Sequence, residues 1–350
     1  MPENKRYRVI QWATGNVGSR ALRAIIEHPR MDLVGLLVTS EAKRGKDAGE
    51  LAGLGREVGV KATLSVDEIV ALDADAVSYM PAYTNWDDVC RLLASGKNIV
   101  TPRGEFLHPS AMDPEKRALV EAACREGGSS IHASGSSPGF ISEALPLPLL
   151  AQQRRLDCFT INEYADMTSR DSHDMIFNMM GYGRSPGQFS QGMLDHVKHD
   201  FSGSLVLLAD AMGITLDDIV VEGEMATANS DKEIAAGTIP AGTVAALRIT
   251  VSGIHKGKPL LRFRANWFCS TDIDEKADWG IEDGVSGWLV NVEGDTPMDV
   301  RITYPVAPED YAAFTPGLTA HRPVNAIPAV VAAEPGIRTT LDLPHIAPAF

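Results

Sequence analysis

The sequence predicts an α/β protein: an N-terminal doubly wound parallel sheet, followed by an α+β region whose sheet is largely antiparallel. Three observations predict this class. Apolar runs and amphipathic segments alternate over the first 140 residues, and a glycine-containing turn joins the first run to the first amphipathic segment. After about residue 150, longer stretches alternate polar and apolar side chains between short polar turns. Repeated strand–helix–strand units favour parallel strands with right-handed crossovers, and period-two alternation favours antiparallel ones.

Five strands and three helices are predicted in the first half. The helix at 17–27 carries Leu22, Ile25 and Ile26 at helical spacing. Glycines end the next two helices at the C-cap position, since Gly96 follows one and Gly127 the other. The predicted strands are 7–12, 32–38, 74–80, 98–101 and 130–133, and the predicted helices are 17–27, 86–94 and 113–125.

The second half predicts long strands around one helix. Strands are expected at 158–164, 243–254, 260–267 and 285–292, with a turn at Lys256-Gly257 between two of them. A helical stretch spans 187–212. The apolar tail 324–333 reads as a helix closed by Pro335-Gly336, and we expect it to return to the first domain.

Charge and cysteine content exclude several classes of function. The 350-residue chain carries a net charge of −14, which repels phosphate backbones and anionic lipids, so we expect neither nucleic-acid nor membrane-surface binding. The four cysteines are scattered without a C-x-x-C pair, which argues against a disulfide framework and a zinc knuckle. No signal peptide or bilayer-spanning run is visible, and we expect a cytoplasmic protein.

A candidate phosphate-binding loop joins the first strand to the first helix. The sequence W-A-T-G-N-V-G, residues 12–18, is the Rossmann dinucleotide fingerprint with alanine in place of its first glycine. Gly15 lets the backbone approach a pyrophosphate, and Gly18 lets helix and strand pack closely. Alanine is compatible with this turn if its φ stays negative. The alternative is a tight structural turn. The candidate cofactor residues here are Ala13, Thr14, Gly15, Asn16, Val17 and Gly18.

The end of the second strand favours NADP over NAD. Hydroxyl groups of Thr39 and Ser40 are followed by Lys43 and Arg44, a set that suits a 2′-phosphate. Glu41 leaves NAD possible, because NAD sites place an acid there for the ribose hydroxyls. The alternative for the cations is that they are solvated loop charges.

One carboxylate follows the strand predicted at 98–101. Pro102 and Gly104 turn the chain there and present Glu105. Ligands of open parallel sheets bind outside the carboxyl ends of the strands, which makes Glu105 a catalytic candidate. The alternative is an ordinary acid on a surface loop.

Several segments together resemble the dihydrodipicolinate-reductase-like superfamily, and most closely its 2,4-diaminopentanoate dehydrogenase and native amine dehydrogenase branch. They are V-I-Q-W-A-T-G-N-V-G (9–18), G-K-D-A-G-E-L-A (45–52), G-E-F (104–106), A-S-G-S-S-P-G-F (133–140) and V-N-A-I-P (324–328). The E-x-H-H-x-x-K-x-D-x-P-S-G-T element of true dihydrodipicolinate reductases is missing, because residues 162–175 read N-E-Y-A-D-M-T-S-R-D-S-H-D-M. The lysine-pathway reaction is therefore not expected.

The resemblance implies a two-domain enzyme with a nicotinamide cofactor. It implies a cofactor domain at 1–145 joined by the tail 318–350, a substrate and dimerisation domain at 146–317, and a homodimer built through the second domain's sheet. It places the catalytic glutamate on Glu105. Met80, at the end of the strand predicted at 74–80, the following Pro81, and Asn325, in V-N-A-I-P, join the candidate cofactor residues.

The expected reaction joins a small ketone or aldehyde with ammonia to give a primary amine, or runs in reverse. Glu105 would act as acid and base, with its pKa raised by desolvation in an apolar pocket. Two alternatives stay open: an imine or oxo reductase that does not use ammonium, and a non-catalytic NADP-binding sensor.

The candidate substrate pocket is largely apolar. Methionines suit irregular ligands, although a methionine-rich stripe is also typical of a core. Arg170 and Arg184 are the nearest arginines and do not occupy an obvious carboxylate position, which favours an uncharged substrate. The candidate pocket residues are Phe140, Tyr164, His173, Met175, Phe177, Met180 and Trp267.

The remaining polar clusters favour structural roles. His196 and His199 lie one helical turn apart without a third ligand, so we predict a solvated helix face and no metal site. His132 is predicted to be a hydrogen-bonded histidine in a buried strand. Ser134 lacks the G-x-S-x-G surroundings of an esterase nucleophile.

Overall fold

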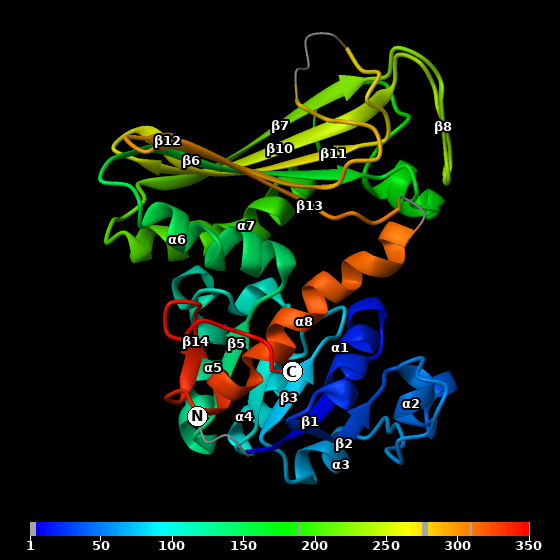
Figure 1. The fold of residues 1–350 in the computed structure, drawn as a ribbon, viewed down its shortest axis with the longest axis vertical. Helices are drawn as coiled ribbons and strands as arrows, with labels where there is room; N and C mark the ends of the chain where they lie inside the picture. The colour runs from blue at the N-terminus through cyan, green and yellow to red at the C-terminus, as the bar shows by residue number, and fades with distance from the viewer. Residues whose placement is uncertain (1–4, 188, 275–278, 308–309, 350) are drawn as a thin grey trace. The chain divides into compact units, whose positions relative to one another are not determined.

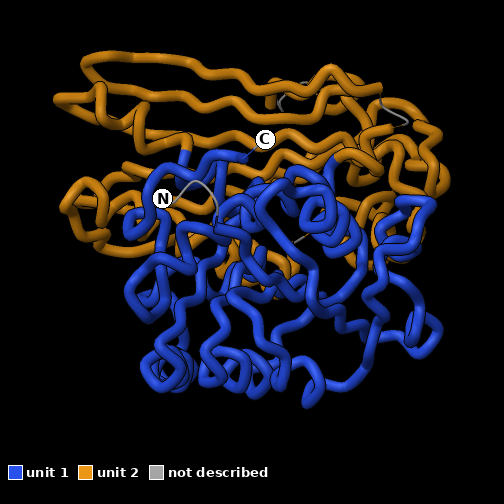
Figure 2. The backbone as a smooth tube through the Cα atoms, turned by 60° about the horizontal axis from the view of Figure 1, so that its bottom comes forward, with its two compact units in different colours: residues 1–144, 315–350 blue, residues 145–314 orange. Residues whose placement is uncertain are grey.

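The structure is a computed structural model that describes residues 5–187, 189–274, 279–307 and 310–349 (Figure 1). The chain forms two compact units (Figure 2). Unit 1 comprises Met1–Ala144 and Thr315–Phe350, and unit 2 comprises Leu145–Phe314. Among the described residues, no helix combines the length and apolar character that crossing a membrane requires.

Unit 1 is built on a parallel six-stranded sheet, which confirms the predicted fold class. The strand order is β14-β5-β4-β3-β1-β2. From β1 the chain adds β2 on one side and then places β3, β4, β5 and β14 on the other. The strand order therefore reverses between β1 and β3, where doubly wound folds bind their ligands. The strands are β1 (Tyr7–Trp12), β2 (Met31–Leu37), β3 (Ala76–Tyr79), β4 (Asn98–Thr101), β5 (Ser130–Ala133) and β14 (Gly336–Arg338).

Helices cover both faces of this sheet. Neighbouring residues of β1 point to opposite faces, because Ile10 packs in a cluster with α3, α4 and α5 whereas Val9 packs with α1 and α8. Side chains of Asn85 and Asp113 cap α4 and α5. The helices are α1 (Asn16–Glu27), α2 (Ala48–Leu51), α3 (Val66–Ala71), α4 (Trp86–Ala94), α5 (Pro114–Gly127) and α8 (Tyr311–Val331).

Helix α8 is longer than predicted. It begins at Tyr311, well before the expected start at residue 324, and it ends at Val331. Pro316 and Pro323 lie inside it, and such prolines resemble helix breakers in a sequence. The helix persists because it buries a continuous stripe of small and apolar side chains, including Ala320, Val324 and Ile327.

Unit 2 contains a mixed, largely antiparallel six-stranded sheet, as predicted. Its order is β13-β12-β6-β11-β10-β7, and every neighbouring pair is antiparallel except β6 with β11. Lys256 and Gly257, with φ values of 51° and 74°, form the turn of the β10–β11 hairpin. The strands are β6 (Leu156–Asp166), β7 (Asp218–Thr227), β10 (Val244–His255), β11 (Lys258–Phe268), β12 (Gly287–Gly294) and β13 (Met298–Thr303).

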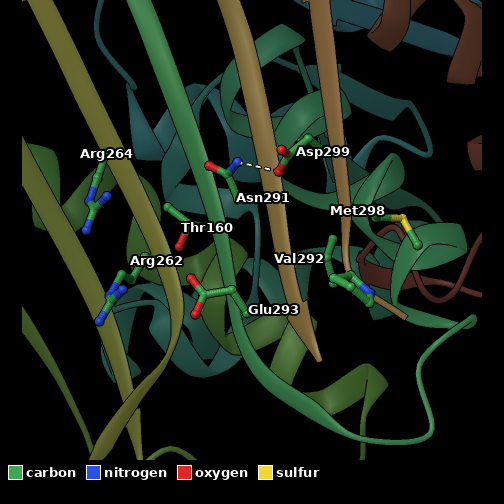
Figure 3. Close-up of a pocket in the computed structure, with 9 residues that line it drawn as sticks. Thr160, Arg262, Arg264, Asn291, Val292, Glu293, Met298 and Asp299 are labelled. Carbon is green, nitrogen blue, oxygen red and sulfur yellow. Dashed lines mark hydrogen bonds between the residues drawn. The ribbon is translucent and has the colours of Figure 1, made fainter. Parts of the chain in front are cut away.

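The two faces of the unit 2 sheet differ in character. Helices α6 (Pro146–Leu150) and α7 (Gln191–Ala211) lie along one face (Figure 1), where Phe201 of α7 stacks on Phe263 of β11. Polar side chains occupy the other face and line a cavity of about 540 Å³ (Figure 3). There the Asn291 amide donates a hydrogen bond to Asp299. The short strands β8 (Lys232–Ile234) and β9 (Gly237–Ile239) form a separate hairpin.

Candidate active site

The candidate phosphate loop starts with a strained residue. Ala13 has a φ of 71°, in the left-handed region, so the condition of a negative φ, stated for alanine at this turn, is not met. Two hydrogen bonds hold this conformation: the Ala13 N–H donates to the Leu37 carbonyl at 2.8 Å, and the buried Gln11 amide donates to the Ala13 carbonyl at 2.8 Å. A left-handed conformation costs a non-glycine residue about 1–2 kcal/mol.

Two glycines of the loop have different structural roles. A Cβ atom on Gly18 would lie 2.3 Å from the Ala13 carbonyl oxygen, so α1 can approach the turn only with glycine there. A Cβ atom on Gly15 would meet nothing within 4 Å. Gly15 is the N-cap of α1 and supplies no side-chain hydrogen bond to the helix. The first N–H groups of α1, from Asn16, Val17 and Gly18, therefore face an open cradle that suits a phosphate.

Lys43 connects the end of β2 to this loop. It lies in the 3₁₀ turn η1 (Glu41–Lys43), and its Nζ donates to the Thr14 carbonyl at 2.8 Å and to Thr14 Oγ1 at 3.1 Å. Arg44 instead pairs with Glu41 at 3.2 Å on the surface. Thr39 and Ser40 are exposed. Of the predicted cations, Lys43 is the one that the structure brings to the loop.

Met80, Pro81 and Asn325 lie near the reversal of strand order. The Met80 N–H donates to the carbonyl of Trp12, the last residue of β1, at 3.0 Å. Met80 also shares a buried cluster with Val324 of α8, next to the half-buried Asn325. The ends of β1 and β3 and the middle of α8 therefore meet around one position.

Glu105 lies in the 3₁₀ turn η2 (Gly104–Phe106), directly after β4. Its side chain is 21% exposed. Oε1 accepts a hydrogen bond from the Arg103 guanidinium at 2.6 Å and another from the Thr84 hydroxyl at 3.1 Å. The carboxylate is therefore held near the carboxyl ends of β3 and β4 and is not turned into bulk water.

The pKa of Glu105 is lowered, so the expectation of a raised pKa is wrong. Burial alone raises the pKa, but the ion pair and hydrogen bond with Arg103, together with smaller contributions from its own backbone N–H and from Thr84, outweigh it. The expectation failed because it placed Glu105 in an apolar pocket without its cationic neighbour. In this structure Glu105 is an anion near neutral pH.

Phe140 is the predicted pocket residue that belongs to unit 1. It lies in η4 (Ser136–Ala144) and is 38% exposed. The Arg322 guanidinium of α8 lies 6.0 Å from the centre of its ring. The Arg322 Nε also donates to Ser134 Oγ at 2.8 Å. Through Arg322, α8 therefore contacts both the Phe140 ring and Ser134, the residue after β5.

The other predicted pocket residues lie in unit 2, and five of them come together. Tyr164, Met175, Phe177, Met180 and Trp267 are partly buried around one apolar cluster. His173 contacts the Phe177 ring, with centroids 4.6 Å apart. The helical turn η5 (Asp174–Met179) supplies Met175 and Phe177, and Met180 follows it as the C-cap.

Sequence reasoning missed four polar residues beside the predicted ones. Arg103 and Thr84 hold Glu105, and Arg322 holds Ser134 and Phe140. Glu163 accepts hydrogen bonds from the indole N–H groups of Trp267, at 3.2 Å, and Trp288, at 3.0 Å. Arg103 lies two residues from Glu105, and this spacing was the one available signal.

Comparison with known proteins identifies the family. The model of the 2,4-diaminopentanoate dehydrogenase C-terminal domain matches residues 166–349. An amine dehydrogenase from Streptomyces virginiae is 32% identical over 349 residues, which cover 96% of this chain and 95% of that protein. A 2,4-diaminopentanoate dehydrogenase from Acetoanaerobium sticklandii is 23% identical over 259 residues, covering 71% of this chain and 66% of that protein.

A solved structure shares the fold. The structure of an amine dehydrogenase from Mycobacterium smegmatis matches with a TM-score of 0.74 and 20% sequence identity, over 98% of this chain and 97% of that one. These findings confirm the resemblance inferred from the sequence. The chain belongs to the amine dehydrogenase and 2,4-diaminopentanoate dehydrogenase family, a family of oxidoreductases that act on CH–NH2 groups.

Proposed function

We propose that the protein is an NAD(P)-dependent amine dehydrogenase that aminates small ketones or aldehydes with ammonia and, in reverse, deaminates primary amines. Glu105 acts as acid and base. The observation that carries this proposal is the ionised, largely buried carboxylate of Glu105 at the carboxyl end of β4, in the unit that holds the candidate phosphate loop.

The loop residues fit a dinucleotide. The open space over Gly15 and the uncapped N-terminus of α1 suit a pyrophosphate, and the ammonium group of Lys43 lies beside them. A nicotinamide group bound there would supply the hydride. We propose NADP as the preferred cofactor, because Lys43 can pair with a 2′-phosphate near Thr39, Ser40 and Arg44. Glu41 keeps NAD possible, since it can accept hydrogen bonds from ribose hydroxyls.

Glu105 would move the protons of the amination. As an anion it accepts a proton from ammonium, and the ammonia that results adds to the substrate carbonyl carbon. The protonated carboxyl then donates its proton as the carbinolamine loses water, and the carboxylate hydrogen-bonds the iminium nitrogen while hydride reaches the carbon. Overall, a ketone, ammonium and the reduced cofactor give an amine, water and the oxidised cofactor.

The substrate is proposed to be small and uncharged. The apolar cluster around Tyr164, Phe177 and Trp267 in unit 2 offers packing surface for such a substrate. The carboxylate of Glu163 already accepts hydrogen bonds from two indole N–H groups, so we do not expect it to bind a cationic substrate.

We further propose that a second copy covers the polar face of the unit 2 sheet. Arg262 and Arg264 of β11 line the cavity of Figure 3 together with Glu293 and Asp299. A face that carries both signs of charge can pair with itself around a two-fold axis. Sedimentation should therefore show a dimer, and reversing both arginine charges with Arg262→Glu and Arg264→Glu should give monomers; unchanged dimers would contradict this interface.

The reaction is tested with purified protein, NADPH, ammonium and simple ketones, following loss of nicotinamide absorbance. Glu105→Gln should lower turnover by at least about 100-fold, as expected for loss of a general acid–base group, while NADPH binding is retained. Glu115→Gln, at an exposed position of α5, is the matched control. Turnover without ammonium would favour an imine or oxo reductase, and NADPH binding without any turnover would favour a sensor.

A further inference from the structure

We propose that Arg103 and Thr84 are positioning residues that bind Oε1 of Glu105 and leave Oε2 for the substrate nitrogen. The proposal rests on the proposed function, because it assigns a task to each oxygen of the carboxylate that performs the proton transfers.

The guanidinium of Arg103 makes three hydrogen bonds in different directions. Its terminal nitrogens donate to Glu105 Oε1 at 2.6 Å and to the Ala82 carbonyl at 2.7 Å. Its Nε donates to Thr84 Oγ1 at 3.2 Å. The Thr84 hydroxyl in turn donates to Glu105 Oε1 at 3.1 Å. A planar guanidinium with all of these contacts has little rotational freedom, so it fixes the carboxylate that it binds.

Both segments that supply this arrangement are themselves anchored. The Arg103 N–H donates to the hydroxyl of Thr101, which is fully buried at the end of β4. The Asn85 N–H donates to the buried hydroxyl of Tyr79, at the end of β3. Arg103 thus joins the loop after β3 to the loop after β4, and Glu105 is held between two fixed strand ends.

The hydrogen bonds from other side chains all reach the same oxygen. Within the described residues, Oε1 accepts from Arg103 and Thr84, and no side chain donates to Oε2; the backbone N–H of Glu105 is the further donor to this carboxylate. A carboxylate oxygen has two lone pairs, so Oε1 is fully used by these two donors. Oε2 keeps the capacity to accept a proton from ammonium and to hydrogen-bond an iminium.

Burial is the largest single effect on the pKa of Glu105 and raises it, and Arg103 is the charged side chain that opposes this effect. On its own segment the titratable neighbours are Arg103 and the buried His108, and on the packed elements they include Tyr79 of β3, Asp88 of α4 and His132 of β5. Burial raises the pKa of Tyr79 and lowers that of His132 to about 4, so both are neutral near pH 7. Without Arg103 the remaining effect of burial would favour the protonated, inactive form of Glu105.

The experiment compares Arg103→Met, Arg103→Lys and Thr84→Val with the unchanged enzyme. Arg103→Met should lower kcat/KM for ammonium by about 10–100-fold, the size expected for hydrogen bonds to a charged group. It should also move the acidic limb of the pH profile to higher pH. The titration of free ammonium is the same for every variant. A shift of the pH–rate profile between variants therefore reports a change in the pKa of a group of the protein. Arg103→Lys should restore most of the pH profile but not the full rate, and Thr84→Val should cost about 3–10-fold.

Three further measurements make the outcomes decisive. NADPH affinity and thermal stability of Arg103→Met should stay close to those of Arg117→Met, a control arginine that pairs with Glu121 on α5. In a Glu105→Gln background, Arg103→Met should have no further effect on ammonium use. Active Glu105→Gln would refute the proposed function itself. An inactive Glu105→Gln with an unaltered profile in Arg103→Met would overturn this inference alone.

Discussion

The Nζ atom of Lys43 lies 2.8 Å from the carbonyl oxygen of Thr14 and 3.1 Å from its hydroxyl. This contact spans 29 residues and fastens the turn after β2 to the loop after β1. The two segments that we propose as contacts of the dinucleotide are thus linked by a direct hydrogen bond. A cation held in this way is also placed without a carboxylate partner in the contacts described for it, so its charge remains available to a phosphate.

Replacing Lys43 tests whether this charge selects the cofactor. Lys43→Ala should weaken NADPH binding by about 10-fold or more, as expected for a lost charge-assisted hydrogen bond, and should weaken NADH binding less. Fluorescence titration of both reduced cofactors gives the ratio. Lys46→Ala is the matched control, because Lys46 pairs with Glu50 on the surface. Equal losses for NADPH and NADH would assign Lys43 to loop structure and not to the 2′-phosphate.

The two loop glycines separate ligand binding from folding. Gly15→Ala places a methyl group in open space at a φ of −71°, so the melting temperature should stay within about 1–2 °C while NADPH binding falls as the methyl enters the phosphate cradle. Gly18→Ala forces a methyl group to 2.3 Å from the Ala13 carbonyl, so it should cost about 1–3 kcal/mol of folding free energy.

Thermal melts without cofactor and NADPH titrations distinguish these two outcomes. If Gly15→Ala lowers the melting temperature as much as Gly18→Ala, the loop is a structural turn and the space over Gly15 has no assigned ligand. If Gly15→Ala binds NADPH normally, the phosphate lies elsewhere.

Most strands of unit 1 could be predicted because the residues within and next to each strand are enough to indicate it. The strands at 7–12, 98–101 and 130–133 match the structure residue for residue, since each is a short buried run between turn residues. The parallel pairing of β6 with β11 could not be read in the same way. It joins residues about 100 positions apart, and no local pattern sets such a partner.

The sequence predicts where Glu105 lies in the fold, but it predicts neither the side chains that bind Glu105 nor the electrostatics around it. The position of Glu105 follows from the strand end before it. Its lowered pKa follows from a guanidinium 2.6 Å away, and a sequence does not say which neighbouring side chain folds back onto which. The same holds for Ala13, whose positive φ depends on hydrogen bonds to Leu37 and Gln11 that exist only in the folded sheet.

His132 is predicted to make the folding stability of the protein depend on pH. It is buried in β5, where its Nδ1–H donates to the Arg338 carbonyl at 2.8 Å, and its Nε2 has no hydrogen-bond partner in the described structure. The prediction of a hydrogen-bonded histidine therefore holds for one nitrogen only. A proton on Nε2 would be buried without an acceptor and near the positive Arg322. Burial is the main cause that lowers the pKa of His132 to about 4.

The stability of the protein should therefore fall on mild acidification. Between about pH 6.5 and pH 4 the unfolded chain protonates His132 while the folded chain does not, so the unfolded state is stabilised relative to the folded state as the pH drops. The difference between the unfolded pKa of 6.5 and the folded pKa of about 4 lowers the free energy of unfolding by about 3 kcal/mol at pH 4. Because the folded pKa lies below the unfolded one, no such loss occurs above pH 7.

Denaturant unfolding at several pH values measures this contribution. His132→Gln can keep a donor for the Arg338 carbonyl but cannot be protonated, so its stability should depend less on pH between 4 and 6.5 than that of the unchanged protein. His199→Gln, at an exposed position of α7, is the control and should leave the pH dependence unaltered. Parallel curves for the unchanged protein and His132→Gln would mean that the buried imidazole takes up its proton without cost, which its missing acceptor argues against.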